Sequence, residues 1–211
     1  MATEPLDQRL QRLASLPQPT PWQRRRNFLI AHHHPILGAI GLLVLLLQWR
    51  AGIPPRDVSH LLDPLVAAGL LLIAAGLGLR SWGAGVLFKS KTLATTGPYR
   101  LCRHPLYLGS LLLMAGFSLL VTPPQLAWLF LVPYLVIHLF RLQREEEVMA
   151  AKFGVAWARY AAEVPRLVPF RLPSGLGSHW SFAQWRRNHE YRAVAGAVLV
   201  LALLLLWREW L

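Results

Sequence analysis

Cysteine and acidic residues are scarce in this chain, and its start lacks the features of a cleavable secretory leader. Its 211 residues include one cysteine, Cys102, so no disulfide can form within the chain. Only 10 residues are Asp or Glu against 22 Lys or Arg, which gives a formal net charge of +12. Residues 1–27 are polar and proline-rich, without the early apolar core of a signal peptide. We therefore expect a basic protein whose first apolar helix is an uncleaved anchor.

Charge of either sign is also sparse for a soluble domain. Charged residues make up 15% of the chain, apolar residues 55%, and the mean hydropathy is +0.38. About a quarter of the residues of an average soluble domain are charged. The apolar residues gather in runs near the roughly 20 residues that cross a bilayer. These runs are 28–49, 61–79, 105–121, 125–140 and 193–207.

The runs predict an all-α polytopic membrane protein with about five transmembrane helices. Only Thr122-Pro123-Pro124 separates the third run from the fourth, so these two helices must form an antiparallel hairpin. Gly69, Gly76 and Gly78 indicate close helix packing in the second run. We expect residues 28–79 to hold the first two transmembrane helices, and 171–211 an interfacial segment and the last one.

The positive charge is distributed unevenly over the connections between these runs. All but three of the 22 Lys and Arg residues fall on one side of the predicted membrane, the exceptions being Arg50, Arg56 and Arg208. By the positive-inside rule this places the N-terminus in the cytoplasm and the C-terminus on the opposite side. The same segregation explains the high pI, so we expect no nucleic-acid partner.

Residues 1–27 then form a cytoplasmic tail. Within it, Leu6 to Leu16 is equally compatible with a short amphipathic helix on the membrane and with a partly ordered tail. Just after it, His32-His33-His34 raises the question of a metal site. Neighbouring helical residues point in different directions, so at most two of them can share one ion. An interfacial cap on the first helix is the better interpretation, and we expect no metal.

Two clusters of polar residues interrupt the apolar pattern. The first runs from Thr96 to Gly109 and ends at the N-terminus of a helix, a position that favours anionic groups. The second is Arg144-Glu145-Glu146-Glu147, after the fourth apolar run. Because the third helix leaves one membrane face and the fourth returns to it, the hairpin must bring both clusters to the same face.

The second cluster admits two interpretations. Its glutamates either neutralise a basic segment or form a site for a cationic ligand, and we favour the ligand. Spacing places four residues on one continuous helix face: Tyr134, His138, Arg141 and Glu145. They form either a functional face within the membrane or an interfacial one with an ordinary Arg141–Glu145 ion pair.

Taken together, the clusters offer carboxylates for a cation, arginines for an anion and aromatic faces for a soft cation. S-adenosylmethionine, which carries an ammonium, a carboxylate, a sulfonium and an adenine, suits this set. Cys102 is a weak candidate nucleophile because the sequence specifies no general base beside it.

Several motifs carry a family resemblance. They are Gly97-Pro98-Tyr99-Arg100, Arg103-His104-Pro105-x-Tyr107-x-Gly109, Glu145-Glu146, Phe153-Gly154-x-x-Trp157-x-x-Tyr160 and Val164-Pro165-Arg166-x-x-Pro169. In this order the chain resembles the integral-membrane methyltransferase superfamily of isoprenylcysteine carboxyl methyltransferases and phospholipid N-methyltransferases. Trp157 stands where that family usually has Tyr. Residues 80–170 would be the methyltransferase core.

The resemblance implies that S-adenosylmethionine binds this core without a Rossmann domain. The residues implied to bind it are Gly83, Gly85, Tyr99, Arg100, His104, Tyr107, Glu145 and Glu146. Beyond the motif, we infer a catalytic set of Arg103, Glu146, Arg166 and His138. Within it, Arg103 or Arg166 would hold the carboxylate of the cofactor or of the acceptor, and Glu145 would hold the cofactor ammonium.

The acceptor is expected to be a lipid or a prenylated molecule that enters from the bilayer, most simply an isoprenylcysteine-type carboxylate. A phospholipid amine is the alternative, and it would need a base such as a glutamate or His138. A membrane reductase using NADPH and a non-catalytic scaffold are rival interpretations from other classes.

Overall fold

Every regular element in the described part of the chain is a helix. The computed structural model describes residues 20–88, 92–170 and 173–207. The elements are α2 (Pro21–Ala31), α3 (His33–Arg50), α4 (Pro64–Val86), η1 (Gly97–Arg100), α5 (Pro105–Val121), α6 (Pro124–Phe153), α7 (Val155–Glu163), α8 (Phe182–Arg187) and α9 (Tyr191–Trp207). Four of the five apolar runs expected from the sequence each lie in one helix, whereas the run 28–49 is divided between α2 and α3; the all-α membrane prediction is confirmed. The segment Leu6 to Leu16 lies outside the described residues.

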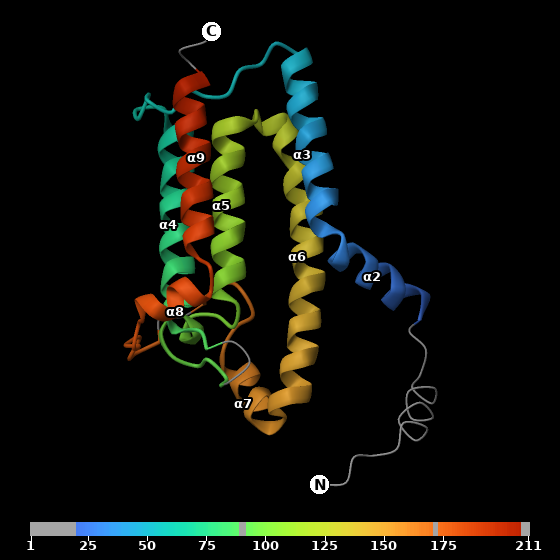
Figure 1. Ribbon diagram of the computed structural model, residues 1–211, viewed down its shortest axis with the longest axis vertical. Coiled ribbons are helices and arrows are strands. Elements are labelled where there is room, and N and C mark those ends of the chain that lie inside the picture. The colour runs from blue at the N-terminus through green and yellow to red at the C-terminus, as the bar shows by residue number, and fades with distance from the viewer. Residues whose placement is uncertain (1–19, 89–91, 171–172, 208–211) are drawn as a thin grey trace.

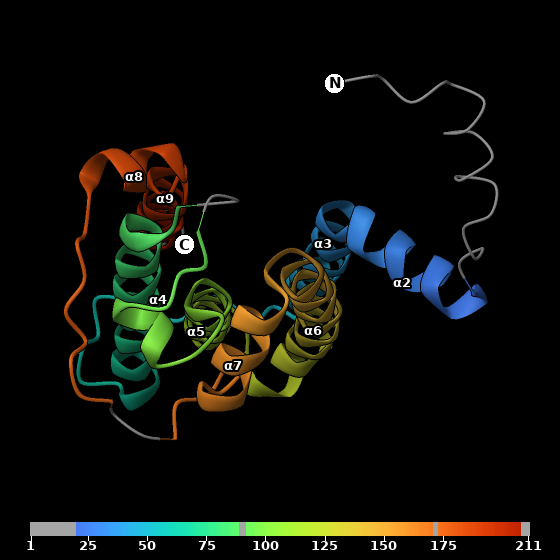
Figure 2. The same cartoon turned by 90° about the horizontal axis from the view of Figure 1, so that it is seen from below.

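The long helices divide into two groups. Helices α4, α5 and α9 run side by side in one group, and α3 lies against α6 in the other (Figures 1 and 2). The short helices α7 and α8 lie at the same end of the bundle, where α4 ends and α5 begins (Figure 1). We call this the α7 end.

Glycines bring α4 and α5 into direct backbone contact. A Cβ added at Gly76 would lie 2.7 Å from the carbonyl oxygen of Gly109, and one at Gly116 would lie 2.6 Å from that of Gly69. Small residues allow this approach between membrane helices. Close packing at Gly69 and Gly76 is therefore confirmed, whereas a Cβ added at Gly78 would meet no atom within 4 Å.

Two of the helices, α4 and α6, are long and apolar enough to cross a membrane. The pair α2 and α3 meets the same test together, with a bend of 68° between them. Helix α2 begins at a capping box in which the Thr20 side chain accepts from the Gln23 N–H while the Gln23 side chain accepts from the Thr20 N–H. Helix α5 and the segment 191–206 are shorter apolar helices.

Two helices extend further than the apolar runs suggest. Helix α4 continues past Leu79 to Val86, so Gly83 and Gly85 lie in its last turns rather than in a loop. Helix α6 continues through the second polar cluster to Phe153. Gly154, whose φ of +49° favours glycine, separates α6 from α7. Helix α7 therefore starts in a new direction.

Candidate functional site

A cavity of about 480 Å³ lies at the α7 end of the bundle. Tyr99, Arg103, His104 and Tyr107 reach it from the first polar cluster, and Glu145 reaches it from the second. The hairpin therefore brings both clusters to one end of the molecule, as the sequence predicts. A volume in the range of about 300–1,000 Å³ is typical of sites for small molecules and cofactors.

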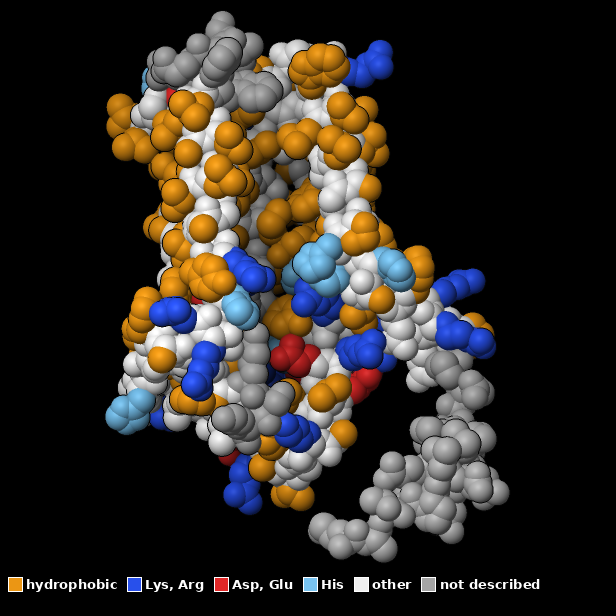
Figure 3. Space-filling view, in the orientation of Figure 1, with side chains coloured by type: hydrophobic (Ala, Val, Ile, Leu, Met, Phe, Trp, Pro, Cys, Tyr) orange, Lys and Arg blue, Asp and Glu red, His pale blue; other side chains and the backbone are white. Residues whose placement is uncertain are grey.

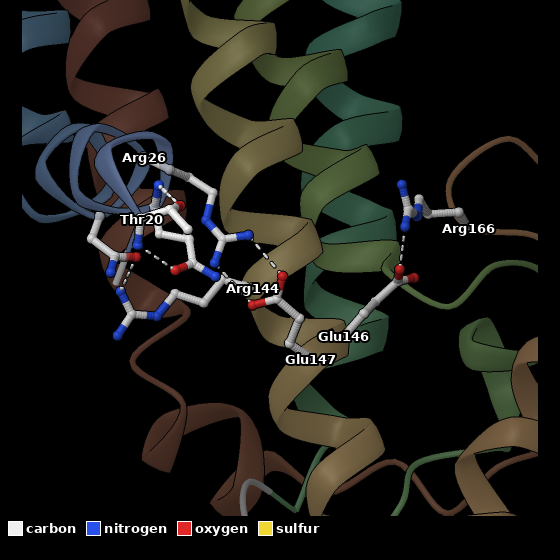
Figure 4. Close-up of polar contacts among 8 residues, drawn as sticks. Thr20, Arg26, Arg144, Glu146, Glu147 and Arg166 are labelled. Atoms are coloured by element: carbon white, nitrogen blue, oxygen red, sulfur yellow. Dashed lines mark hydrogen bonds and ion pairs between the residues drawn. The ribbon is translucent and has the colours of Figure 1, made fainter. Parts of the chain in front are cut away.

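The three consecutive glutamates of α6 face three different neighbours. Glu145 lines the cavity. Glu146 faces the start of α5 and accepts hydrogen bonds from His104 and Arg166. Glu147 faces α2, where the Arg26 guanidinium donates two hydrogen bonds to it at 2.7 and 3.0 Å (Figure 4). Consecutive helical residues are rotated by about 100°, since 3.6 of them complete a turn, so this divergence follows from helix geometry.

Glu146 anchors the first polar cluster. Its carboxylate lies 3.1 Å from the Arg103 Nη1 atom and 3.2 Å from the His104 Nε2 atom. Arg166 bonds to its other oxygen (Figure 4). The Glu146 side chain is only 11% exposed. The described lining of the cavity does not include it, so its effect on a ligand would pass through Arg103 and His104.

His104 is buried where α5 begins, and burial lowers the pKa of its imidazole below the ordinary value, against the opposing effect of the Glu145 and Glu146 charges. The imidazole is therefore neutral at neutral pH. A neutral imidazole can donate from Nε2 to the Glu146 carboxylate, and that bond fixes the tautomer and orientation of the ring.

The predicted face of α6 is confirmed. His138, Arg141 and Glu145 all line the cavity, and the Tyr134 ring stacks on His138 with centroids 3.9 Å apart. The His138 Nδ1 atom lies 2.9 Å from the Tyr134 carbonyl oxygen. Because a carbonyl oxygen can only accept, Nδ1 carries the proton, and Nε2 of the neutral ring is left as an acceptor.

Within the described residues, Arg141 and Glu145 form no ion pair with each other or with any other side chain. The interpretation of an ordinary i,i+4 pair is therefore wrong. The Arg141 guanidinium instead lies over the Tyr107 ring, 5.5 Å from its centroid. Two opposite charges thus line one cavity without a direct ion pair between them.

The C-terminal part of the chain supplies a further wall of the cavity. Glu190 is 3% exposed and accepts two hydrogen bonds from Arg80, at 2.7 and 2.9 Å. Arg80 also bonds to Ser110 on α5. His189, with a φ of 57°, occupies the left-handed region just before Glu190. The segment before α9 is thereby tied to both α4 and α5, and Asn188 joins it in lining the cavity.

Tyr99 carries a buried polar atom without a partner. Its side chain lines the cavity, and its hydroxyl makes no hydrogen bond to the described residues. Burial raises the pKa of this hydroxyl, so it stays protonated. Tyr160 donates to the Tyr99 carbonyl oxygen at 2.7 Å and fixes the backbone there. A buried hydroxyl left unbonded is costly, which makes this one a candidate ligand contact.

Four other predicted site residues lie outside the described cavity lining. Gly83 packs against Leu106, and Gly85 leaves room for the Trp180 indole, so both glycines serve helix packing here. Arg100 is exposed and donates to the Gly175 carbonyl oxygen. Arg166 is half-exposed and bonds to Glu146.

Cys102 is fully buried, and burial raises the pKa of its thiol to about 11. At neutral pH it is a protonated thiol, which is a poor nucleophile. The structure thus supports the low weight that the sequence gives to a catalytic cysteine.

Sequence reasoning did not select two charged residues of the cavity, Arg80 and Glu190. It did place Arg141 on one helix face with His138 and Glu145, but it assigned no ligand to it. Arg80 and Glu190 are 110 positions apart and no motif links them.

The fold and site define a helical integral membrane protein with a cofactor-sized polar cavity at one end of its bundle. A family model described as phospholipid methyltransferase matches residues 65–156. That range covers α4 to α6, which carry most of the cavity lining. No solved structure matches the chain.

The individual relatives have names from three different functional classes. The cobalt-zinc-cadmium resistance protein CzcN of Cupriavidus metallidurans is 30% identical over 147 residues, 68% of this chain and 66% of that protein. The Delta(14)-sterol reductase TM7SF2 of Mus musculus is 29% identical over 164 residues, 72% of this chain and 36% of that protein. Protein-S-isoprenylcysteine O-methyltransferase A of Arabidopsis thaliana is 37% identical over 78 residues, 37% of this chain and 40% of that protein.

These matches and the motifs in the cavity make the chain similar to the integral-membrane methyltransferase superfamily, with the family match over residues 65–156. The alignments span less than two thirds of the sterol reductase and of the isoprenylcysteine methyltransferase, and 66% of CzcN.

Proposed function

We propose that this protein transfers a methyl group from S-adenosylmethionine to a membrane-embedded acceptor that carries an isoprenylcysteine-type carboxylate. One observation carries the proposal: the cavity presents an unpaired carboxylate, Glu145, beside a buried hydroxyl without a partner, Tyr99. A buried hydroxyl is costly to leave unbonded, and a carboxylate without a cationic partner attracts a cation, so together they support a bound polar ligand.

The residues present fit the proposed cofactor. Glu145 suits its ammonium, and the Tyr99 hydroxyl can donate to one of its polar atoms. Tyr107, Trp157 and Tyr160 line the same cavity and offer aromatic faces to a sulfonium or an adenine. The other predicted cofactor residues would support this lining rather than touch the ligand.

Bound S-adenosylmethionine supplies an electrophilic methyl group: an acceptor atom bonds to the methyl carbon, and the sulfur keeps the electron pair of the broken bond. The chain contributes position and exclusion of water. Glu146 fixes Arg103 and His104, which hold the wall of the cavity at the start of α5. A carboxylate acceptor needs no base.

We further propose that the cavity faces the cytoplasm. The side chains at the α7 end include most of the Lys and Arg residues on the visible face of the molecule (Figure 3). The positive-inside rule supports a cytoplasmic N-terminus and a C-terminus on the other side. The core 80–170 would then work together with the segment around Glu190, which lies beyond it.

A phospholipid N-methyltransferase is the second candidate, and His138 favours it. The free Nε2 atom of His138 is oriented by the bond from Nδ1 to Tyr134 and can take a proton from an amine acceptor. The similarity to a sterol reductase keeps NADPH as a rival cofactor. Similarity to a metal resistance protein suggests a metal role, yet the described residues contain no group of three side chains able to hold a metal ion.

A thermal-shift titration of detergent-purified protein tests the proposal. S-adenosylhomocysteine at about 100 times its dissociation constant should add about 2.7 kcal/mol of apparent stability. Glu145→Gln should abolish this gain, while the matched change Glu163→Gln, at an exposed position on α7, should keep it. A shift with NADPH alone would assign the reductase chemistry instead. Cooperative melting with no shift for either ligand would favour a non-catalytic scaffold.

A further inference from the structure

Three arginines line the cavity, and they differ in how their charge is compensated. Arg80 is bonded to Glu190, and Arg103 lies 3.1 Å from Glu146. Arg141 has no carboxylate partner in the described part of the chain. Its contact with the Tyr107 ring orients the guanidinium without cancelling its charge. An unpaired cation beside the apolar part of a membrane protein indicates an anionic ligand.

The position of Arg141 on α6 separates it from the proposed cofactor contact. Arg141 lies one helical turn before Glu145, about 6 Å closer to the middle of the apolar part of α6. The sequence assigned the anion to Arg103 or Arg166. Both of these are bonded to Glu146, and Arg166 does not line the described cavity. Arg141 is the cavity arginine whose charge is available.

An apolar groove adjoins the polar cavity at Tyr134 and His138, on the face of α6 that also carries Arg141. The groove lies between α3 and α6 and is lined by His34, Leu37, Gly41, Leu45, Phe130 and Tyr134. Tyr134 stacks on His138, which lines the polar cavity, so the two hollows adjoin at this pair of rings. This groove lies within the second group of helices; apolar side chains also follow the hollow between the two groups, above basic and histidine side chains (Figure 3).

We propose that Arg141 binds the anionic group of the acceptor, while the hydrocarbon chain of the acceptor lies in the groove between α3 and α6. This inference rests on the proposed function and adds the substrate class: an amphiphile whose carboxylate or phosphate lies directly beside its apolar chain. Arg141 then orients the acceptor, and Glu145 holds the other ligand. The Tyr107 ring contacts Arg141 and lines the same cavity as Glu145.

The test separates this role from cofactor binding. The wild type, Arg141→Gln, Arg141→Lys and the control Arg144→Gln are purified in detergent; Arg144 is exposed and bonds to Asn27 on α2. S-adenosylhomocysteine binding is measured by calorimetry. An N-acetylated S-prenyl cysteine and phosphatidic acid are then each titrated by thermal shift at saturating S-adenosylhomocysteine, as the carboxylate and phosphate probes.

We expect Arg141→Gln to bind S-adenosylhomocysteine within threefold of the wild type and to bind the anionic probe at least tenfold more weakly. Arg141→Lys should recover part of that loss, and Arg144→Gln should behave as the wild type. The probe that binds the wild type more tightly shows whether the anionic group of the acceptor is a carboxylate or a phosphate. The inference is overturned if Arg141→Gln weakens S-adenosylhomocysteine instead, or if neither probe binds the wild type. A wild type that does not bind S-adenosylhomocysteine would refute the proposed function itself.

Discussion

The three glutamates of α6 allow a sharp test, because the same substitution at adjacent positions should have three different effects. Each is changed separately to glutamine, which keeps the size of the side chain and removes its charge. Glu146 holds Arg103 and His104, whose side chains are 16% and 5% exposed. Glu147 holds Arg26, but its own side chain is 49% exposed. Glu145 has no ion-pair partner among the described residues.

The expected losses follow from this burial. Removing one partner of a buried pair costs about 3–5 kcal/mol, so Glu146→Gln should lose about 3 kcal/mol of unfolding free energy. Arg166 adds little, because its side chain is 46% exposed. Glu147→Gln should lose about 1 kcal/mol after allowing for solvent screening. Glu145→Gln should stay within about 0.5 kcal/mol of the wild type.

Melting of the three variants in one detergent measures these differences. For a chain of this length, 1 kcal/mol shifts the melting temperature by about 2–4 °C, so Glu146→Gln should melt about 6–12 °C below the wild type. Only Glu145→Gln should combine an unchanged melting temperature with loss of the response to S-adenosylhomocysteine. Equal destabilisation by Glu145→Gln and Glu146→Gln would refute the division of roles.

Three further predictions concern pH, packing and the C-terminal wall. Burial holds the pKa of His104 below its ordinary value, so the unfolded chain binds more protons than the folded one as pH falls through about 6.5, and the free energy of unfolding should decrease there. The variant His104→Gln should flatten this dependence on pH between about 5 and 7. An unchanged slope would contradict the assignment. Gly76→Ala should lower the melting temperature by forcing α4 away from α5. The Cβ added by Gly78→Ala meets no atom within 4 Å, so that variant should melt at the same or a higher temperature. Equal effects of the two variants would count against backbone contact at Gly76. Glu190→Gln should destabilise the protein by about 3 kcal/mol because Arg80 loses its buried partner. When Arg80→Gln is added to Glu190→Gln, the further loss should be much smaller than the loss from Arg80→Gln alone. Additive losses in this double-mutant cycle would argue against the pair.

The helical architecture could be predicted from sequence because apolar runs and turns determine it locally. The short connection at Thr122 and Pro123 was enough to bring the two polar clusters to one end. Helix ends were harder, since α4 and α6 continue into polar sequence where hydropathy gives no signal. The break before α7 depends on the backbone conformation of Gly154, which composition alone does not reveal.

The candidate site was predictable in its chemistry but not in its pairing. Sequence placed Tyr99, Arg103, His104, Tyr107, His138 and Glu145 together, and all of them line the cavity. It could not assign a neighbour to each glutamate, because the neighbours come from α2, from the start of α5 and from the segment after α7. Arg80 and Glu190 escaped notice for the same reason: their pairing depends on how α9 returns to α4.

The bond between Arg26 and Glu147 has a consequence for synthesis of the protein on the ribosome. The two residues are 121 positions apart, so Glu147 follows Arg26 by about 6–24 s at roughly 5–20 residues per second. During that interval Arg26 has no Glu147 to pair with, and it belongs to the basic run Arg24-Arg25-Arg26. In the topology that we propose, its charge counts towards the positive-inside signal before that pairing forms, and the same side chain ties α2 to α6 once the hairpin is complete.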